Sequence, residues 1–295
     1  MGKYSYVETV KSDIRKVLIR NEDCVLLTIS FLGTGAGNCI HRSHTSMVLD
    51  WGNDRRVMLD TGSGNSALIN GAKLGIFSSD IHQILLSHGH FDHMGGLPHI
   101  QGNRTSVIPE ANPLKVYASG VTLARVKKLF EATTITHKID DHGASSASGE
   151  RLIEWEPVDS GKVLKLGESI SAYSFEVDHI PGTVGWRLEC DGVSVVFSGD
   201  TRVCQAVSTA AHGVDVLIHE ALSTEDSSER TKNRGHSTAA EAGQIASSAD
   251  AKRLVMTHID TKFHSCTEKL IEEAMQYYSG PIQVADDLTQ IVVES

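Results

Sequence analysis

The segment Leu86-Ser-His-Gly-His-Phe-Asp-His-Met-Gly-Gly-Leu97 decides how this sequence is interpreted. Four residues that can hold a metal ion, His88, His90, Asp92 and His93, fall within six positions. Imidazole nitrogens and carboxylate oxygens are donors that Zn²⁺ and similar ions take in proteins. Because side chains alternate after a strand, His88 and His90 point to one side, and Asp92 and His93 can turn toward a second point. The pattern indicates two ions, and chance clustering on a surface loop is a remote alternative.

A single segment rarely closes a site for two ions, so further ligands are expected at strand ends elsewhere. His179, Asp200 and His258 each come just after an apolar stretch with strand character. Open α/β sheets build their sites at such ends. Taken alone, each of these residues is more simply a surface, core or turn residue. Beside the histidine cluster they become candidate metal ligands.

Composition describes an ordinary globular chain with an acidic balance. Its 295 residues are 40% hydrophobic and 22% charged, and the net charge is −10. This balance argues against a surface coated with phosphate-binding cations, while a local basic patch stays open. Neither an apolar leader nor a stretch near the ~18 residues of a bilayer span occurs. The five scattered cysteines contain no Cys-x-x-Cys, so we expect a cytoplasmic chain that does not bind membranes.

Strands and helices are expected to interleave in one domain over 25–295, with residues 1–24 as a short N-terminal extension. Two capping boxes, Thr238 with Glu241 and Ser265 with Glu268, predict helices to about 249 and 278. The polar segment 224–235 predicts a mobile surface loop. A further helix is predicted over 121–132. Apolar runs and turn residues predict strands over 25–32, 46–49, 56–60, 84–86, 171–177, 185–190, 193–198, 214–218 and 254–257.

Motifs along residues 31–258 resemble the metallo-β-lactamase superfamily, and within it most closely the ribonuclease Z branch. The pairing of His219-Glu220-Ala221 with His236-Ser237-Thr238 points to that branch. The resemblance implies an α/β fold, an αββα four-layer sandwich with the site at one edge. The matching stretches are Phe31–Gly37 (FLGTGAG), Leu59–Gly62 (LDTG), Leu86–Leu97, Asp178–Arg187 (DHIPGTVGWR), Val196–Arg202 (VFSGDTR), Leu217–Ala221 (LIHEA), His236–Ala242 (HSTAAEA) and Met256–His258 (MTH).

The resemblance also implies a role for each matching residue at a site with two Zn²⁺ ions per chain, with Mn²⁺ or iron as alternatives. A hydroxide held between the ions would attack the phosphorus of a phosphodiester. Asp92 would be both a ligand and a catalytic residue, and Asp60 would orient the ligand loop. The implied ligands are His88, His90 and His179 for the first ion, Asp92, His93 and His258 for the second, and Asp200 as the bridge.

A catalytic dyad of His236 and Glu220 follows from the same resemblance. Glu220 would orient the imidazole and raise its basicity, so that His236 protonates the leaving oxygen. The alternative is that His236 only precedes a helix and Glu220 is a salt-bridge partner at a strand end. His219 is expected to be structural, because adjacent strand residues face opposite ways. The loop Phe31–Gly37 is expected at the rim of the site.

The resemblance stops at the part that grips RNA. Most bacterial ribonuclease Z enzymes insert a tRNA-gripping arm between the equivalents of His179 and Asp200. Here only 20 residues lie between the two, and they are expected to form two strands joined by a hairpin turn at Asp191-Gly192. The expected substrate is therefore a small molecule or a short phosphodiester, with tRNA as an alternative that a basic groove near Arg187 and Arg202 would favour.

Other functions stay open beside the phosphodiesterase. The same metal site could serve an arylsulfatase, a lactonase or a β-lactamase. A metal-binding scaffold without turnover is a third hypothesis, and a homodimer, which the branch often forms, is an open alternative for assembly.

Overall fold

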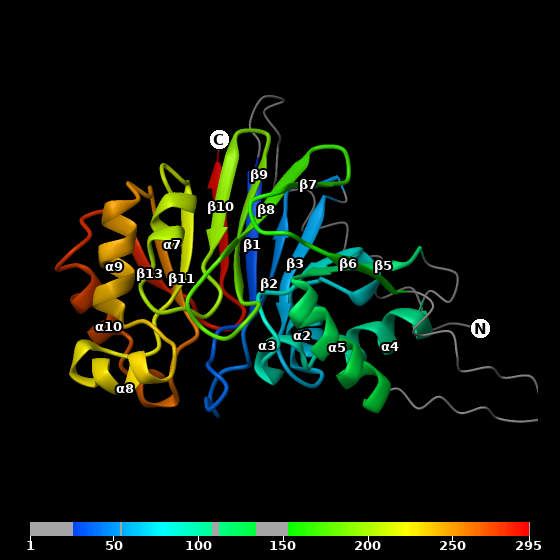
Figure 1. Ribbon diagram of the computed structural model, residues 1–295, viewed down its shortest axis with the longest axis horizontal. Helices are drawn as coiled ribbons and strands as arrows, with labels where there is room; N and C mark the ends of the chain where they lie inside the picture. The colour runs from blue at the N-terminus through cyan, green and yellow to red at the C-terminus, as the bar shows by residue number, and fades with distance from the viewer. Residues whose placement is uncertain (1–25, 54, 108–111, 134–152, 295) are drawn as a thin grey trace, which may run out of the picture.

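Two β-sheets stacked face to face, with helices on both outer faces, make up the computed structural model (Figure 1). The structure describes residues 26–53, 55–107, 112–133 and 153–294. The predicted extension over 1–24 lies outside these residues. Within them the strands form two seven-stranded sheets, each with antiparallel strands at one end and parallel strands at the other.

The strand order places parallel strands side by side in both sheets. The strands from β3 to β6 run parallel, and so do those from β10 to β13. The first sheet contains, in spatial order, β14 (Gln290–Glu294), β1 (Leu26–Gly33), β2 (Ser46–Asp50), β3 (Arg56–Thr61), β4 (Gln83–Leu85), β5 (Leu114–Ala118) and β6 (Ile153–Pro157). The second contains β13 (Ile282–Val284), β12 (Leu254–Thr257), β11 (Val216–Glu220), β10 (Val193–Phe197), β9 (Val184–Cys190), β8 (Ile170–Glu176) and β7 (Val163–Leu166).

Three layers of apolar side chains hold the sandwich together. The inner layer lies between the sheets and includes the fully buried Phe31, Trp186 and Ile218. Two outer layers lie between each sheet and its helices. The first sheet is covered by α2 (Ser66–Lys73), α4 (Leu97–Val107) and α5 (Gly120–Thr133), and the second by α7 (Gln205–Ala210), α9 (Ala239–Ser248) and α10 (Glu268–Ala274). The predicted αββα architecture is confirmed.

The surroundings of strand β11 explain why its sequence is apolar at successive positions. Val216 and Ile218 belong to the inner layer, whereas Leu217 packs under the helices of the outer layer. A parallel strand that is covered on both faces has no solvent-facing side, so a continuous apolar run is favourable. Continued alternation places Glu220 on the inner face and His219 on the outer face.

Most predicted strands and helices are present with shifts of one or two residues, but two predictions at helices are wrong. The segment 224–235 is not a plain loop: it forms the short η2 (Glu225–Ser227) and α8 (Ser228–Asn233). Thr231 explains this, because its buried hydroxyl lies 2.6 Å from that of Ser223 and fixes the segment against the core.

The Ser265 capping box is the second wrong prediction. The helix α10 has Thr267 as its N-cap, without a side-chain hydrogen bond, and it ends at Ala274. The turn η3 (Thr261–Phe263) brings the chain into α10, because Cys266 N donates to Phe263 O. The capping box of Thr238 and Glu241 is confirmed at α9.

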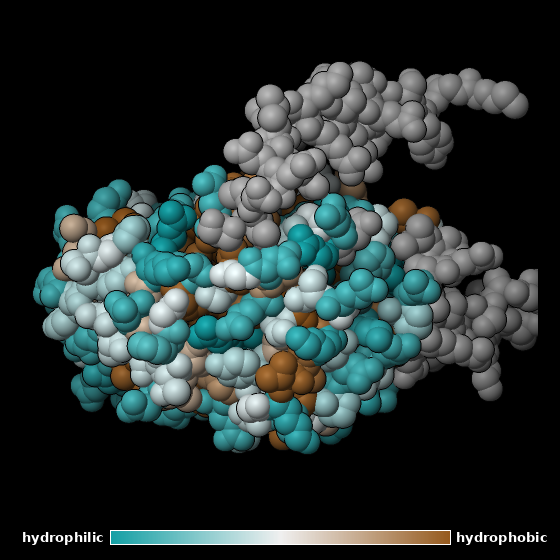
Figure 2. Space-filling view, turned by 90° about the horizontal axis from the view of Figure 1, so that it is seen from above, coloured by the Kyte–Doolittle hydropathy of each residue, from teal (hydrophilic) through white to brown (hydrophobic). Residues whose placement is uncertain are grey.

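Among the described helices, none combines the length and apolar character that a membrane span needs. The face seen from above in Figure 2 is mostly hydrophilic, and its hydrophobic residues form small separate groups. Scattered apolar residues of this kind are normal on globular proteins.

The last described residues brace a loop near the beginning of the chain. β14 pairs with β1, with Leu26 opposite Glu294. Just before β14, Asp287 Oδ1 accepts hydrogen bonds from Thr34 N at 3.0 Å and Thr34 Oγ1 at 2.9 Å, and its Oδ2 accepts from Ser43 N at 2.7 Å. These bonds hold both ends of the loop that follows β1.

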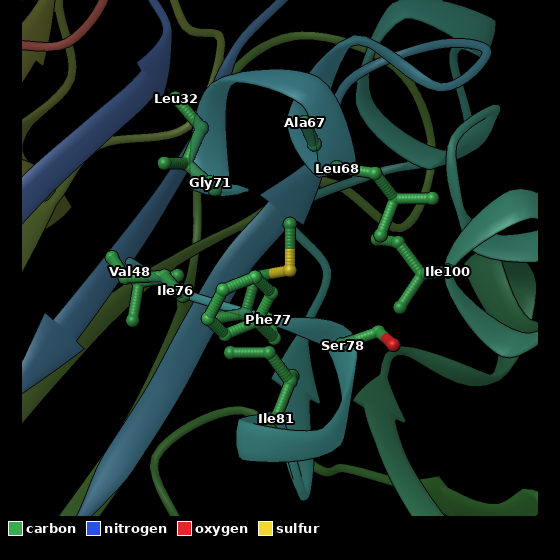
Figure 3. A pocket seen from close by; sticks show the side chains of 11 residues that line it. Leu32, Val48, Ala67, Leu68, Gly71, Ile76, Phe77, Ser78, Ile81 and Ile100 are labelled. Carbon is green, nitrogen blue, oxygen red and sulfur yellow. The ribbon is translucent and has the colours of Figure 1, made fainter. Parts of the chain in front are cut away.

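A small apolar cavity lies between α2 and the first sheet, and none of its described lining residues is a histidine (Figure 3). Its volume is about 20 Å³, and Leu32, Val48 and Ile100 are among the side chains around it. Among the described residues that line it, Ser78 has the one polar side chain, and its hydroxyl already donates to Asn103 Oδ1 at 2.8 Å, so we interpret the cavity as a packing gap and not as a binding site.

The cavity predicts where the core is sensitive to truncation. Ile100→Ala enlarges the existing gap, since Ile100 is 2% exposed. We expect it to lower the free energy of unfolding by about 2–5 kcal/mol. Ile69→Ala on α2 is the control, because Ile69 is 50% exposed and should cost about 0.5 kcal/mol or less. Urea titrations of both variants measure the difference, and equal midpoints would contradict the packing argument.

Candidate metal centre

The predicted metal ligands meet where the carboxyl ends of parallel strands from both sheets converge. His88 to His93 follow β4 of the first sheet. Asp200 and His258 follow β10 and β12 of the second sheet, and His179 follows β8. This edge carries the start of α3 (Phe91–Met94), near the bottom of the view in Figure 1. The site therefore joins the two sheets at a strand-end position typical of α/β proteins.

The carboxylate of Asp200 lies at the centre of the cluster and is 2% exposed. Its Oδ2 atom lies 3.2 Å from Nε2 of His93, 3.3 Å from Nε2 of His258, 3.5 Å from Nε2 of His88 and 3.9 Å from Nε2 of His179. One carboxylate oxygen thus faces imidazoles from both halves of the molecule.

All seven predicted ligands are brought together, in groups whose potential donor atoms lie within 4.8 Å of one another. One group contains His88, His90, His179 and Asp200, and a second contains Asp92, His93 and His258. A third group contains Asp200, His236 and His258. Asp200 belongs to the first group and also lies 3.2 Å from His93 Nε2 and 3.3 Å from His258 Nε2, so its carboxylate adjoins the second group as well.

Asp60 orients this ligand loop through three hydrogen bonds of 2.7 Å. Its carboxylate accepts from Ser87 N, from Ser87 Oγ and from His93 Nδ1. Because Nδ1 of His93 is held in this way, Nε2 is directed at the cluster. Asp60 is completely buried and has a φ of 51°, a backbone conformation that non-glycine residues seldom adopt.

Two glycines let the backbone approach the ligands closely. Gly235 O accepts a hydrogen bond from His179 Nδ1 at 2.8 Å. Gly235 has a φ of 88°, and a Cβ atom on it would lie 2.5 Å from His179 Nδ1. A Cβ atom on Gly37 would lie 2.8 Å from Asp92 Oδ2. Side chains at these two positions would displace His179 and Asp92, which are two of the candidate ligands.

The charges within the cluster shift the pKa values of its carboxylates and imidazoles. Burial alone would raise the pKa of Asp200, but the imidazoles of His258 and His93 outweigh it and hold that pKa well below its usual range. Burial would lower the pKa of His93, but Asp200 and Asp92 raise it well above the ordinary value. At His88, burial and the neighbouring His93 together lower the pKa. A neutral imidazole such as that of His88 is ready to bind a metal ion.

The donor set fits divalent metal ions. The Nε2 atoms of His93 and His258 are buried and make no hydrogen bond among the described residues, since Asp200 Oδ2, at 3.2 and 3.3 Å, does not meet them with hydrogen-bond geometry. Buried polar atoms seldom stay unpaired, and a bound cation would satisfy both. Imidazoles with carboxylates suit Zn²⁺, and iron or Mn²⁺ accept similar ligands.

Glu220 and His236 form the contact that the dyad requires. His236 Nδ1 lies 3.0 Å from Glu220 Oε1 and 3.1 Å from Oε2. Glu220 is 1% exposed and also accepts hydrogen bonds from Thr201 N and Ser237 N. Burial would lower the pKa of His236, but the Glu220 carboxylate outweighs it and raises that pKa to about 9. His219 is buried on the other face, where its Nδ1 donates to Glu220 O at 2.7 Å.

A pocket of about 180 Å³ opens onto this cluster. His236 and two of the candidate ligand carboxylates lie in its wall, together with part of the loop after β1 that was expected at the rim. The lining residues are Ala36, Gly37, Asn38, His90, Asp92, Asp200, Leu222, Arg234, His236 and His258.

Comparison with known proteins identifies the family. A family model described as a beta-lactamase superfamily domain matches residues 55–259. The chain belongs to this superfamily. The ribonuclease Z of Nocardia farcinica is 29% identical over 285 residues, which cover 85% of this chain and 92% of that protein.

Solved structures with low sequence identity share the fold of this superfamily member. The metallo-beta-lactamase fold protein YhfI from Bacillus subtilis aligns with a TM-score of 0.74 and 18% identity, over 92% of this chain and 100% of that one. The short form of human tRNase Z aligns with a TM-score of 0.70 and 21% identity, over 90% of this chain and 98% of that one. The metallo-β-lactamase fold is thereby confirmed.

This member of the superfamily has no arm between His179 and Asp200. All residues between these two are described, and they contain β9 and β10 joined by the predicted Asp191-Gly192 hairpin. Nor do the two arginines nearby offer a basic groove. Arg187 binds Glu189 and the carbonyls of residues 210 and 212, and Arg202 binds Asp178 and a carbonyl of α8.

Three residues at the site were not predicted from the sequence. Ser87 orients Asp60, and Gly235 fixes His179, as described above. Arg234 lines the pocket. The Gly-His pair before the capping box of α9 is a signal that could have drawn attention to Gly235, whereas Ser87 and Arg234 carry no local signal.

Gly235→Ala tests the close contact with His179. We expect it to lower Zn²⁺ affinity by about 10–100-fold, because the new methyl group displaces a ligand imidazole. Gly213→Ala is the matched control: Gly213 also has a positive φ, of 64°, but nothing lies within 4 Å of the added Cβ. Competition with a chromogenic chelator measures both affinities. Equal losses in the two variants would show that backbone strain, and not the contact, is responsible.

The Glu220–His236 pair predicts a pH dependence for the metal-free protein. The pKa of His236 in the folded state, about 9, lies above the ordinary value of 6.5. The charged pair therefore stabilises the fold fully below about pH 6.5, and this contribution is lost as the pH rises through about 9. NMR titration of the His236 ring in chelator-treated protein checks the value. A pKa that stays near 9 in Glu220→Gln would contradict the assigned cause.

Proposed function

We propose that this protein is a dinuclear, zinc-dependent phosphodiesterase of the ribonuclease Z type. The observation that carries the proposal is the contact of the buried Glu220 with the part-buried His236, beside seven converging candidate ligands. A metal site alone would serve many hydrolases of this superfamily. The pair adds a proton donor, which is needed when the leaving group is a poor one.

The ions would occupy the two adjacent donor groups, with Asp200 between them. When bound, two such ions polarise the ester and make water nucleophilic near neutral pH. Asp92 is proposed both as a ligand and as a catalytic residue, because it also lines the pocket. The proposed ligands are His88, His90 and His179 for one ion, Asp92, His93 and His258 for the other, and Asp200 for both.

His236 would protonate the leaving oxygen. Glu220 binds Nδ1 of the ring, so the proton for the substrate is on Nε2, and His236 lines the pocket. An alkoxide leaves slowly unless it is protonated, and a positioned acid contributes typically about 10²–10⁴-fold to the rate. This chemistry favours phosphodiesters and sulfate esters over lactams.

A small or short substrate fits the shape and charge of the chain. Relatives named ribonuclease Z align over most of their length, which supports a phosphodiester as the bond that is cleaved. The arm position holds only a hairpin, Arg187 and Arg202 are both engaged, and the net charge is −10. We therefore propose short single-stranded phosphodiesters in preference to tRNA.

The dyad predicts an effect that depends on the leaving group. His236→Gln should lower kcat on a dinucleotide by about 10²–10⁴-fold, because an alkoxide must be protonated. The loss on bis(p-nitrophenyl) phosphate should be much smaller, since p-nitrophenolate leaves without help. His212→Gln, at an exposed histidine, is the control and should change neither rate. Metal content is measured alongside, so that ion loss is not mistaken for a missing acid.

Parallel assays with p-nitrophenyl sulfate, a lactone and a β-lactam test the substrate class on the zinc-loaded protein. Phosphodiester turnover that dominates and needs His236 supports the proposal. If the lactone or lactam dominates and His236→Gln is harmless, the dyad is structural and the phosphodiesterase proposal is wrong. Turnover of none of these substrates by the loaded protein would favour the scaffold hypothesis.

A further inference from the structure

We propose that Arg234 is a substrate-binding residue that selects anionic tetrahedral esters, phosphodiesters or sulfate esters, over neutral ones. This inference rests on the proposed function and names the substrate charge that the same site would accept. Three observations carry it: the position of Arg234 in the pocket, the absence of a partner for its guanidinium among the described residues, and the fixed backbone beneath it.

The first observation is that Arg234 lies in the wall of the metal pocket. It shares this wall with His236 and with the carboxylates of Asp92 and Asp200. Of the described residues that line the pocket, it is the one lysine or arginine. A cation at this place is next to both the proposed proton donor and the proposed ligands.

The second observation concerns hydrogen bonding. Other arginines near the site are engaged: Arg42 with Thr34 and Asp286, Arg187 with Glu189, and Arg202 with Asp178. Across the described part of the chain, the Arg234 guanidinium makes no hydrogen bond or ion pair, and the residue is exposed. Its five N–H donors are therefore available to a ligand.

The third observation is that the backbone around Arg234 is fixed on both sides. On one side, Gly235 O holds His179, and the Glu220 pair holds His236. On the other side, Arg202 Nε donates to Lys232 O at 2.6 Å. A long side chain that starts from a fixed backbone loses less freedom on binding than one on a mobile loop, so it contributes more to affinity.

The positive charge of the Arg234 guanidinium would offset the negative charges that surround an anionic ester in the pocket. Asp92 and Asp200 bring two negative charges to the pocket, and the whole chain has a net charge of −10. An anionic ester is repelled by these carboxylates unless cations offset them. The planar fork of a guanidinium matches two oxygens of a phosphoryl or sulfuryl group, and such charge-assisted bonds are strong and directional. A neutral ester gains little from the same contact.

The test compares two substrates with one leaving group. Methyl p-nitrophenyl phosphate is a monoanion, and dimethyl p-nitrophenyl phosphate is its neutral counterpart. On the zinc-loaded protein, Arg234→Gln should raise KM for the anion about tenfold or more, change kcat by less than about threefold, and leave kcat/KM for the neutral ester unchanged. The KM of Arg234→Lys for the anion should lie between those of the wild type and Arg234→Gln, because lysine keeps the charge but lacks the planar pair of donors. Arg230→Gln is the matched control on α8 and should alter nothing, since Arg230 is exposed and outside the pocket wall.

A binding measurement separates this inference from the proposed function. Calorimetric titration of the zinc-loaded proteins with inorganic phosphate should show a Kd about tenfold weaker in Arg234→Gln than in the wild type. This result is expected whether or not phosphodiesters are cleaved. Diester turnover with an unchanged KM and an unchanged phosphate Kd in Arg234→Gln would overturn the role of Arg234 and leave the proposed function standing.

A third substrate distinguishes phosphodiesters from sulfate esters as the preferred class. p-Nitrophenyl sulfate carries the same charge and leaving group as the phosphate diester. If Arg234→Gln raises KM for both, the residue recognises the shared anion, and the relative kcat/KM values of the wild type identify the preferred class. An equal loss on the neutral triester would show that Arg234 acts on the structure of the pocket, and would overturn the inference.

Discussion

The buried carboxylate of Asp200 is the constraint on which the rest of the site depends. A carboxylate taken out of water is very unfavourable unless other groups compensate its charge. The compensating imidazoles of His88 and His93 come from the other sheet, so the two sheets must bring their strand ends together. Gly199 permits this, since a Cβ atom there would lie 3.0 Å from Val184 O and 3.1 Å from Ser87 Cβ. The ligand geometry is thus tied to the packing of the sandwich.

The sequence predicted the parts of the site that local spacing and strand ends determine. The His88 to His93 cluster is visible because its ligands lie within one short segment. His179, Asp200 and His258 could be added because carboxyl ends of strands meet at one edge of a sheet, and the structure brings all of them together. The αββα fold was implied by the resemblance of these motifs to the metallo-β-lactamase superfamily. Glu220 and His236 are also in contact, although 15 residues lie between them along the chain.

Features that arise from tertiary contacts could not be predicted in the same way. The helix α8 forms in a polar segment because Thr231 is anchored in the core, and nothing in the local composition indicates this. Ser265 and Glu268 have the spacing of a capping box, yet the preceding turn makes Thr267 the N-cap. Arg234 is one arginine among several. Its importance depends on which neighbours leave it unpaired, and that is known only when the whole structure is assembled.

The pairing of β14 with β1 has a consequence for how the protein is made. A ribosome synthesises β1 early and β14 last among the described strands, so β1 waits tens of seconds or so for its neighbour. During this time the outer edge of β1 exposes unpaired backbone groups, which can template association with another chain. Asp287 is synthesised just before β14, and until then Thr34 and Ser43 lack the hydrogen-bond acceptor that holds the loop between them. The pocket wall formed by the loop after β1 is therefore completed only after residues 287–294 have been synthesised, long after the histidine motif at residues 88–93.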